Sequence, residues 1–358
     1  MILSMTGGGA ERQLSRLAPE LSGRGHDVHL AFVYPGVNSE RLDGRGCTLH
    51  HLAVSGSRKS LLPAKSFSLV RRLRPDVLQT WLIHMDIVGG ATARMLGVPW
   101  VMSERSAALT YPKTLLNRAR LALGKRADLI VPNSPGGAEY WTAHGVELSH
   151  IEIVPNFVTQ QEIESANGLR DSRIAEDDEL LLYIGRLSPE KNIPALIDAM
   201  RHVCRVRELA KLAICGEGPM LTGLTAQARA AGLEERIVFA GFVPDIASWL
   251  KRSRAVVAVS LVEGHPSAVL EAMAAGVPVV VSDIPAYRSL LNDDSASFVP
   301  AGDPLEIAAA LVRTLKDRRS AGERAARAKE GMRSLSLEVA VTRYEDIYRR
   351  LLAGRGTR

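Results

Sequence analysis

Two carboxylates and a helix start stand close together in one stretch of the sequence, residues 263–283, EGHPSAVLEAMAAGVPVVVSD. An apolar strand precedes it, and Pro266 and Ser267 are residue types that favour the first turn of a helix. The free N–H groups and positive dipole end of such a helix form a site for a phosphate or another anion. Glu263 before the helix and Glu271 inside it can accept paired hydrogen bonds from vicinal hydroxyls. The pattern therefore predicts a site that binds sugar, phosphate and sugar in sequence.

The elements that must hold these residues repeat the order strand, turn, helix along the chain. In the first half, strands are predicted at 2–5, 27–34, 48–54, 77–79, 100–103, 129–131 and 151–154, with helices such as 11–21 and 115–125 between them. In the second half, strands are predicted at 180–184, 211–214, 237–240, 256–259, 279–281 and 297–299, and helices at 193–206, 220–231, 246–251 and 268–275. Val-, Ile- and Leu-rich strands that alternate with helices indicate parallel sheets covered by helices on both faces.

Two such repeats in 358 residues predict an α/β protein with two doubly wound, Rossmann-like domains that face a cleft. The first domain is expected at 1–158, and the second, at 159–336, begins with the polar stretch 159–179. An amphipathic helix at 337–352 is a candidate to pack back on the first domain. Ligands of such sheets bind beyond the carboxyl ends of the strands, so residues directly after strands are the candidates for a site.

The composition is that of an ordinary globular protein, with 46% hydrophobic and 23% charged residues. The three widely spaced cysteines, Cys47, Cys204 and Cys215, fit free thiols in a reducing compartment better than disulfides or a metal site. No apolar run reaches the about 18 residues that span a bilayer, and the N-terminus carries no basic leader, so we expect a cytoplasmic protein.

Basic residues are concentrated in one part of the chain. Between Arg58 and Arg126 there are 13 Lys and Arg residues and three acidic ones, whereas the whole chain has a net charge of +6. Such a field favours anionic partners, among them phospholipid headgroups, lipid pyrophosphates and nucleic acid. The alternative is a solvated, arginine-rich surface without a partner.

The stretch 263–283 resembles the signature of the family 4 glycosyltransferases, which are retaining enzymes of the GT-B fold, and its E-x7-E pattern is intact at Glu263 and Glu271. Other stretches resemble further motifs of the family in the same order: GGGAERQL at 7–14, RGHDV at 24–28, VPN at 154–156, GRLSPEKN at 185–192 and GEGP at 216–219. The resemblance extends over nearly the whole chain. Several motifs in order are more specific than any single one.

The resemblance implies a role for each matching residue. Arg186 and Lys191 would hold the donor diphosphate. Glu271 would bind the ribose hydroxyls, and Glu263 the hydroxyls of the transferred sugar near its anomeric carbon. Further donor-binding positions would be Gly7, Gly8, Gly9, Gly216, Val243, His265, Pro266, Ser267, Ala268 and Val269. The simpler explanation of the charged residues is a solvated surface, and that of the glycines is a tight turn.

Three residues of the first half are further candidates. His84 follows a predicted strand, as a His often does in this part of the family, and it could orient the transferred sugar or simply be packed. Glu104 and Arg105 lie at the end of the strand predicted at 100–103 and are candidates for the acceptor side. The basic and apolar run 55–75 suggests a lipid-linked acceptor and a peripheral enzyme on an anionic membrane face.

The expected reaction is transfer with retention through an oxocarbenium-like transition state. In the front-face type of this reaction the leaving phosphate accepts the proton of the acceptor, so a general base is not required. Catalysis would rest on placing the acceptor hydroxyl and on neutralising diphosphate charge. No Asp-x-Asp motif occurs, so we expect neither a metal nor another cofactor. The expected partners are a nucleotide-diphosphate sugar and a carbohydrate or lipid-linked acceptor, not nucleic acid.

Three other functions stay open as alternatives. A dinucleotide-dependent oxidoreductase would need a glycine fingerprint followed about 20 residues later by an acid, and Asp27 after Gly7–Gly9 matches it poorly. A GT-B-type sugar-nucleotide epimerase would need additional carboxylates, which cannot be placed from the sequence. A non-catalytic nucleotide-sugar-binding protein is disfavoured because the charged motif residues are intact. The sugar, the base and the acceptor cannot be read from the chain.

Overall fold

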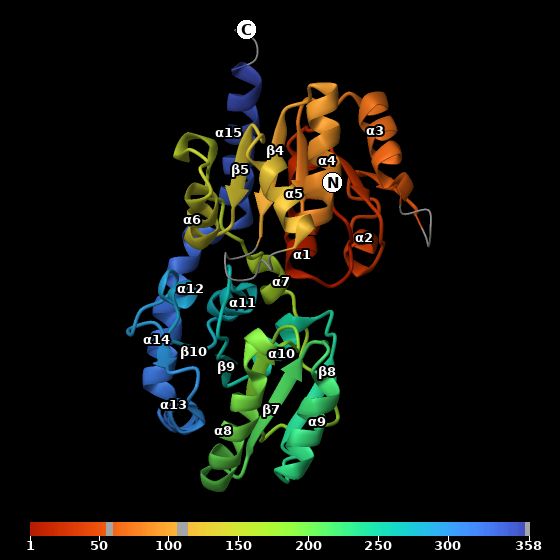
Figure 1. The fold of residues 1–358 in the computed structure, drawn as a ribbon. Helices are drawn as coiled ribbons and strands as arrows, with labels where there is room; N and C mark the ends of the chain where they lie inside the picture. Colours follow the sequence, from red (N-terminus) through yellow and green to blue (C-terminus); the bar gives the residue numbers. More distant parts are fainter. Residues whose placement is uncertain (55–59, 106–113, 355–358) are drawn as a thin grey trace. The chain divides into compact units, whose positions relative to one another are not determined.

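The computed structural model describes residues 1–54, 60–105 and 114–354 and divides the chain into two compact units. Unit 1 comprises 1–157 and 337–358, and unit 2 comprises 158–336. The chain therefore leaves unit 1 once, forms unit 2 and returns to unit 1 with its last helix (Figure 1). Both units are α/β with parallel sheets, as the alternation of strands and helices predicts.

Unit 2 contains a six-stranded parallel sheet in the order β11-β10-β9-β6-β7-β8. Its strands are β6 (Glu179–Ile184), β7 (Ala210–Cys215), β8 (Ile237–Gly241), β9 (Ala255–Ala258), β10 (Val279–Ser282) and β11 (Ser297–Val299). This is the doubly wound order, in which the direction of winding reverses between β6 and β9. A ligand site is therefore expected beyond the carboxyl ends of these two strands.

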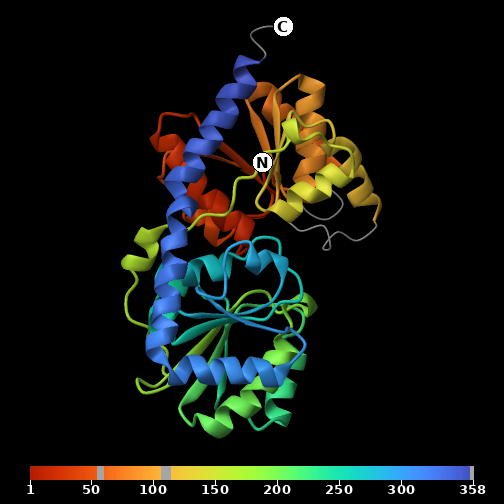
Figure 2. The same cartoon turned by 90° about the vertical axis from the view of Figure 1, so that its left-hand side faces the viewer.

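Apolar residues on both faces of this sheet explain its two layers of helices (Figure 2). Along β6, Leu181 and Tyr183 belong to one apolar cluster and Leu180 and Leu182 to the other, and all four are buried. The helices are α7 (Gln160–Glu164), α8 (Ile193–Val206), α9 (Leu221–Ala230), α10 (Ile246–Arg252), α11 (Ser267–Ala275), α12 (Pro285–Arg288), α13 (Pro304–Lys316) and α14 (Arg318–Glu330), with 3-10 helices η4 (Pro189–Lys191) and η5 (Gly331–Leu335).

Unit 1 contains two short parallel sheets, β1-β2 and β3-β4-β5. The strands are β1 (His29–Phe32), β2 (Thr48–His51), β3 (Leu78–Trp81), β4 (Trp100–Glu104) and β5 (Leu129–Pro132). The helices are α1 (Gly9–Gly23), α2 (Val37–Glu40), α3 (Leu62–Leu73), α4 (Ile83–Leu96), α5 (Leu115–Gly124), α6 (Pro135–Ala143), the 3-10 helix η3 (Leu148–His150) and α15 (Leu337–Ala353).

The N-terminal segment connects the two sheets of unit 1. Ile2 pairs with Trp81 of β3, and Ser4 pairs with Tyr34 beyond β1, each through an isolated bridge. The segments predicted as strands at 2–5 and 151–154 are thus not continuous strands. They pair with their neighbours at single positions, which is too little for a ladder.

The last helix, α15, belongs to the core of unit 1. Ala340, Val341, Tyr344 and Ile347 are at most 4% exposed and join the same apolar cluster as the buried face of α1. Their helical spacing places them on one face, which this cluster covers. The C-terminal segment is therefore part of the first Rossmann-like unit in space, although it follows the second in sequence.

None of the helices in the described ranges combines the length and the apolar composition needed to cross a membrane.

Candidate functional site

The charged residues of the predicted donor site gather beyond the carboxyl ends of β6 and β9, where the winding of unit 2 reverses. Arg186 and Lys191 lie in the loop after β6, and Glu263 lies in the loop between β9 and α11. Lys191 Nζ is 2.6 Å from Glu263 Oε1, and the two side chains are 20% and 14% exposed. This ion pair brings the two loops together and excludes Lys191 as an ordinary solvated side chain.

Two further side chains hold the Glu263 carboxylate. The Ser260 hydroxyl donates to Oε1 at 2.8 Å, and the Tyr287 hydroxyl donates to the same oxygen over a longer 3.4 Å. Burial, with the Glu263 charge adding to it, raises the pKa of the Tyr287 hydroxyl well above its ordinary value, so this group stays a proton donor. Sequence reasoning missed both residues. Ser260 could have been found because it directly follows a strand, whereas no spacing connects Tyr287 with Glu263.

The loop after β6 is fixed at several points. The Tyr183 hydroxyl donates to the carbonyl of Arg186 at 3.0 Å, and burial raises the pKa of this hydroxyl. The backbone carbonyl of Glu190 accepts a hydrogen bond from the N–H of Leu261. The side-chain carboxylate of Glu190 accepts a hydrogen bond from the Ser188 hydroxyl at 2.6 Å. The loop is thus tied to the end of β9, and its cations are presented from a rigid support.

Arg186 is exposed, unlike the half-buried Lys191. Burial alone would raise the pKa of the neighbouring Glu190, but the Ser188 hydrogen bond and the positive charges of Lys191 and Arg186 lower it. Both cations therefore act on the same small region beyond β6. Such a pair can neutralise a diphosphate group.

Two glycine loops interlock at the ends of β6 and β7. Gly216 has φ +149°, and a Cβ there would lie 1.9 Å from the carbonyl oxygen of Gly185. A Cβ on Gly218 would lie 2.4 Å from the carbonyl oxygen of Leu187. A side chain at either position would push the two loops apart, so glycine is required by close approach of backbone. Val243, one of the predicted donor-binding positions, is half-buried in the loop after β8.

The helix predicted near Pro266 is α11, for which Pro266 is the N-cap residue. Two of the donor-binding positions predicted here offer no unused backbone N–H group. Pro266 has no N–H, and the N–H of Val269 already donates to the carbonyl of Pro266 at 3.0 Å. Ser267 and Ala268 are the first two residues of α11, and their backbone N–H groups lie before the first intrahelical hydrogen bond. His265 is half-buried directly before this helix start.

Glu271 lies one turn inside α11, and it is only 3% exposed. Glutamates are rarely buried to this degree without a specific partner. The simpler explanation of Glu271 as an exposed helix residue is therefore wrong. Its role toward a ribose stays a prediction.

The residues predicted in the first half belong to unit 1. His84 is exposed at the start of α4, directly after β3, and its role stays a prediction. Gly7 and Gly9 are exposed. Gly8 is the N-cap of α1, and a Cβ there would lie 2.1 Å from a carboxylate oxygen of Glu11, so a side chain at this position would displace the flexible end of Glu11.

Glu104 does not fit the predicted acceptor side, because it is 0% exposed. Its carboxylate accepts hydrogen bonds from Arg120 at 2.9 Å and from the indole N–H of Trp141 at 3.0 Å. The same Arg120 donates to the buried Asp86 at 2.7 Å. A buried carboxylate needs such counter-charges, so the contacts account for Glu104 as part of the unit 1 core.

Arg105 is likewise held inside unit 1. Its guanidinium lies 4.0 Å from the centre of the Trp81 ring and donates to the Tyr344 hydroxyl and, at 3.2 Å, to Asn156. These contacts connect β4 with α15. They give Arg105 a structural role in joining the C-terminal helix to the sheet.

No group of three or more His, Cys, Asp or Glu residues within the described part of the chain could hold a metal ion. The absence of a metal requirement stays a prediction.

Two Rossmann-like units, with a charged site at the switch point of the second, are the architecture of GT-B glycosyltransferases. Two family models match the chain: "Glycosyl transferases group 1" at residues 166–334 and "Glycosyl transferase 4-like domain" at residues 8–156. Together these matches show that the chain belongs to the family 4 glycosyltransferases.

Curated relatives agree with this assignment, and a solved structure agrees with the fold. The chain is 29% identical over 312 residues to the N-acetylgalactosamine-N,N'-diacetylbacillosaminyl-diphospho-undecaprenol 4-alpha-N-acetylgalactosaminyltransferase of Campylobacter jejuni, with 82% of each chain covered. It is 28% identical over 334 residues to the GDP-mannose-dependent alpha-(1-6)-phosphatidylinositol dimannoside mannosyltransferase of Mycobacterium tuberculosis, covering 87% of this chain and 84% of the relative. The structure of Anabaena HepE in complex with UDP-glucose superposes with a TM-score of 0.85 at 18% identity, covering 97% of this chain and 98% of that one.

Proposed function

We propose that this glycosyltransferase moves a hexose-type sugar from a nucleotide-diphosphate sugar to a hydroxyl acceptor, with retention and without a metal. The observation that carries the proposal is the 2.6 Å contact of Lys191 with Glu263, beside the start of α11. It assembles a cation, a carboxylate and a helix N-terminus at the switch point of a doubly wound sheet. This combination fits a diphosphate flanked by sugars.

The roles proposed for these side chains are those that the family resemblance implies, and their charges and burial support them. Arg186 and Lys191 bind the diphosphate, and their charge stabilises it as it leaves. Glu263, kept in place by Ser260 and Tyr287, accepts hydrogen bonds from hydroxyls of the transferred sugar. The carboxylate of the buried Glu271 accepts hydrogen bonds from the ribose hydroxyls.

In the proposed step the bond between the anomeric carbon and the diphosphate oxygen breaks, and the acceptor oxygen bonds to the same face of that carbon. The acceptor proton passes to the leaving diphosphate oxygen, so the products are the glycoside and the nucleoside diphosphate. The two cations supply the charge that a metal would otherwise bring. For His84 we propose a role in orienting the transferred sugar rather than that of a base.

For the acceptor we propose a lipid-linked molecule or a precursor of a cell-surface polysaccharide. The names of both curated relatives support this proposal, since one contains diphospho-undecaprenol and the other a phosphatidylinositol dimannoside. The basic and apolar run 55–75 supports it as well, although residues 55–59 of this run lie outside the described ranges. Peripheral association with an anionic membrane is part of the same proposal.

A thermal-shift screen with UDP-, GDP- and ADP-sugars tests the donor. A donor at about 100 times its Kd adds about 2.7 kcal/mol of stability, which is a measurable rise in Tm. The substitution Glu271→Ala should abolish that rise, whereas Glu306→Gln on the exposed start of α13 should leave it unchanged. No stabilisation by any nucleotide sugar would exclude the proposed donor class.

The stereochemical and metal proposals have their own tests. The anomeric configuration of the first product, followed by NMR during the reaction, should equal that of the donor. Activity should persist in EDTA. An inverted product would overturn retention, and activity lost in EDTA and restored by Mg²⁺ or Mn²⁺ would overturn metal independence.

A further inference from the structure

Cations of unit 1 gather at the sheet edge opposite to the strand ends that carry His84 and Arg105. Helices α3, α4 and α5 end at this edge, where β3, β4 and β5 begin. Six Lys and Arg residues lie in or directly after the last turns of these helices: Arg71, Arg72, Arg74, Arg94, Lys125 and Arg126. A single cation at a helix C-terminus is explained by the helix dipole. Six at three neighbouring helix ends exceed that explanation.

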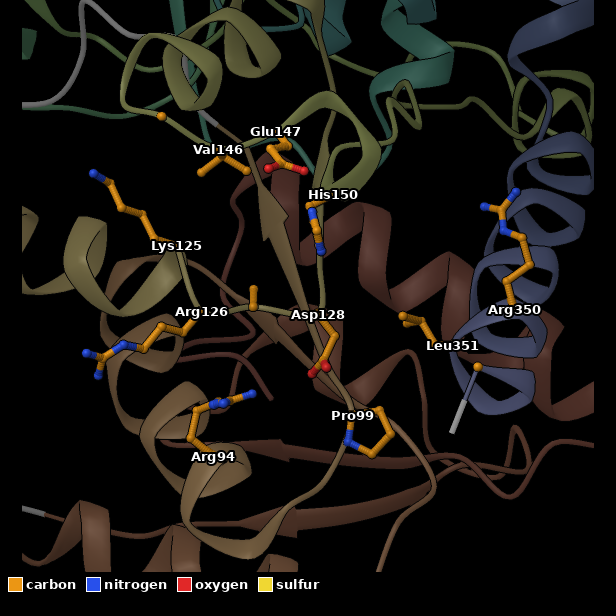
Figure 3. A pocket seen from close by; sticks show the side chains of 13 residues that line it. Arg94, Pro99, Lys125, Arg126, Asp128, Val146, Glu147, His150, Arg350 and Leu351 are labelled. Atoms are coloured by element: carbon orange, nitrogen blue, oxygen red, sulfur yellow. The ribbon is translucent and has the colours of Figure 1, made fainter. Parts of the chain in front are cut away.

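Three of these cations line a hollow of about 840 Å³ between the starts of β4 and β5 and the end of α15. Figure 3 shows Arg94, Lys125 and Arg126 on one side of the hollow, Arg350 on the other, and Asp128 between them. A hollow of this size can hold a small-molecule ligand, for which volumes of about 300–1,000 Å³ are usual. Among the described residues, Glu147 is the other acid that lines it, and it projects from the loop after α6.

Asp128 and Glu147, which line the hollow, form no ion pair with Arg94, Lys125 or Arg126. One carboxylate oxygen of Asp128 accepts a hydrogen bond from the backbone N–H of Trp100 at 2.8 Å, which fixes the start of β4. Arg350 is paired with Glu152, outside the lining of the hollow. The three cations on the first side form no ion pair with any other residue that the structure describes. They are exposed and therefore able to bind an external anion.

The side chains are suited to phosphate in particular. Guanidinium groups form two parallel hydrogen bonds with phosphate oxygens, and an ammonium group adds a compact charge. Two large apolar side chains neighbour the hollow in sequence, Met95 after Arg94 and Leu148 after Glu147, and they are 74% and 73% exposed. Cations beside exposed apolar side chains also occur on surfaces that contact phospholipids.

We propose that this hollow binds a phosphate group, from either a soluble phosphate compound or an anionic phospholipid headgroup. Strand β4 has five residues, so the hollow and the opposite edge of the sheet are about 16 Å apart. The site is therefore distinct from the end of unit 1 that carries His84. It does not depend on the donor chemistry proposed for unit 2.

The soluble source is tested by isothermal titration of the full chain with inorganic pyrophosphate. The double substitution Arg94→Gln/Arg126→Gln should remove one equivalent of binding or weaken it about tenfold or more, because two charged contacts are lost. The control Arg118→Gln/Arg319→Gln removes the same charge from exposed sites outside the hollow and should bind like the wild type. Loss of pyrophosphate binding only on substitution of Lys191, with the hollow variant unchanged, would count against a soluble source.

The lipid source is tested by sedimentation with vesicles of phosphatidylglycerol or of phosphatidylcholine. Binding to the anionic vesicles that falls in the hollow variant, persists in the control and weakens with salt identifies a headgroup. An effect of the hollow variant in either arm supports the proposal and identifies its source. Equal behaviour of the hollow variant and its control in both arms overturns the proposal. None of these outcomes depends on whether the protein transfers a sugar, so the two proposals fail separately.

Discussion

The substitution Lys191→Met removes the positive charge beside Glu263 and retains an apolar side chain of similar length. In the structure Lys191 Nζ is 2.6 Å from Glu263 Oε1, and solvent reaches only 20% and 14% of the two side chains. Hydrogen bonds between charged groups contribute about 1.5–3 kcal/mol. Because Ser260 and Tyr287 still hold the carboxylate, we expect the free energy of unfolding of unit 2 to fall by about 1–2 kcal/mol.

The effect of Lys191→Met on transfer should be larger than its effect on folding. The proposed role of Lys191 is to neutralise charge that develops on the leaving diphosphate. Loss of one preorganised electrostatic partner lowers kcat by about 100- to 1,000-fold, or about 2.7–4 kcal/mol. An ion pair that is merely structural would lower stability without this loss of rate.

The assay is the initial rate of nucleoside diphosphate release with the donor found in the thermal-shift screen, measured together with thermal unfolding. Lys316→Met on the exposed end of α13 is the matched control, because it removes the same charge far along the chain from the site. Lys191→Arg should retain part of the rate, since it keeps the charge. A Lys191→Met protein of lowered stability whose kcat/KM stays within about threefold of the wild type would refute the catalytic role.

Three further predictions concern residues inside the individual units. Gly216→Ala places a Cβ 1.9 Å from a backbone carbonyl oxygen, so donor affinity measured by calorimetry should fall about tenfold or more. Gly223→Ala has open space around it, so its effect on the free energy of unfolding should be neutral or a gain of up to about 1 kcal/mol. Arg120→Met leaves two buried carboxylates without their cation, and the free energy of unfolding from urea titration should fall by about 3–5 kcal/mol; an unchanged midpoint would contradict this. Burial, together with the charges of a neighbouring histidine and arginine, lowers the pKa of His50. The folded protein therefore binds this proton less readily than the unfolded chain, so stability should fall as the pH drops below about 6.5, and less so in His50→Gln.

The sequence by itself determined the fold class and the order of the donor-site loops. Strands such as β6, apolar on both faces, can only be buried between two helix layers, so the alternation predicts parallel sheets without knowledge of contacts. Glu263 was identifiable because it lies between a strand and a helix start, where doubly wound sheets bind ligands, and Arg186 and Lys191 because the stretch 185–192 resembles a motif of the family. The helix at 267–275 was identifiable from its proline start and glycine stop.

Only the tertiary structure decided which of the polar side chains meet. Tyr287 reaches Glu263 because β10 follows β9 in the sheet and α12 follows β10, a relation that no local pattern encodes. Glu104 ends a strand like the donor-site residues, yet Arg120 and Trp141 hold it in the core. The side chain at the end of a strand is exposed or buried according to which residues pack over it. The partners that decide this are distant in sequence, and the order of the strands brings them together.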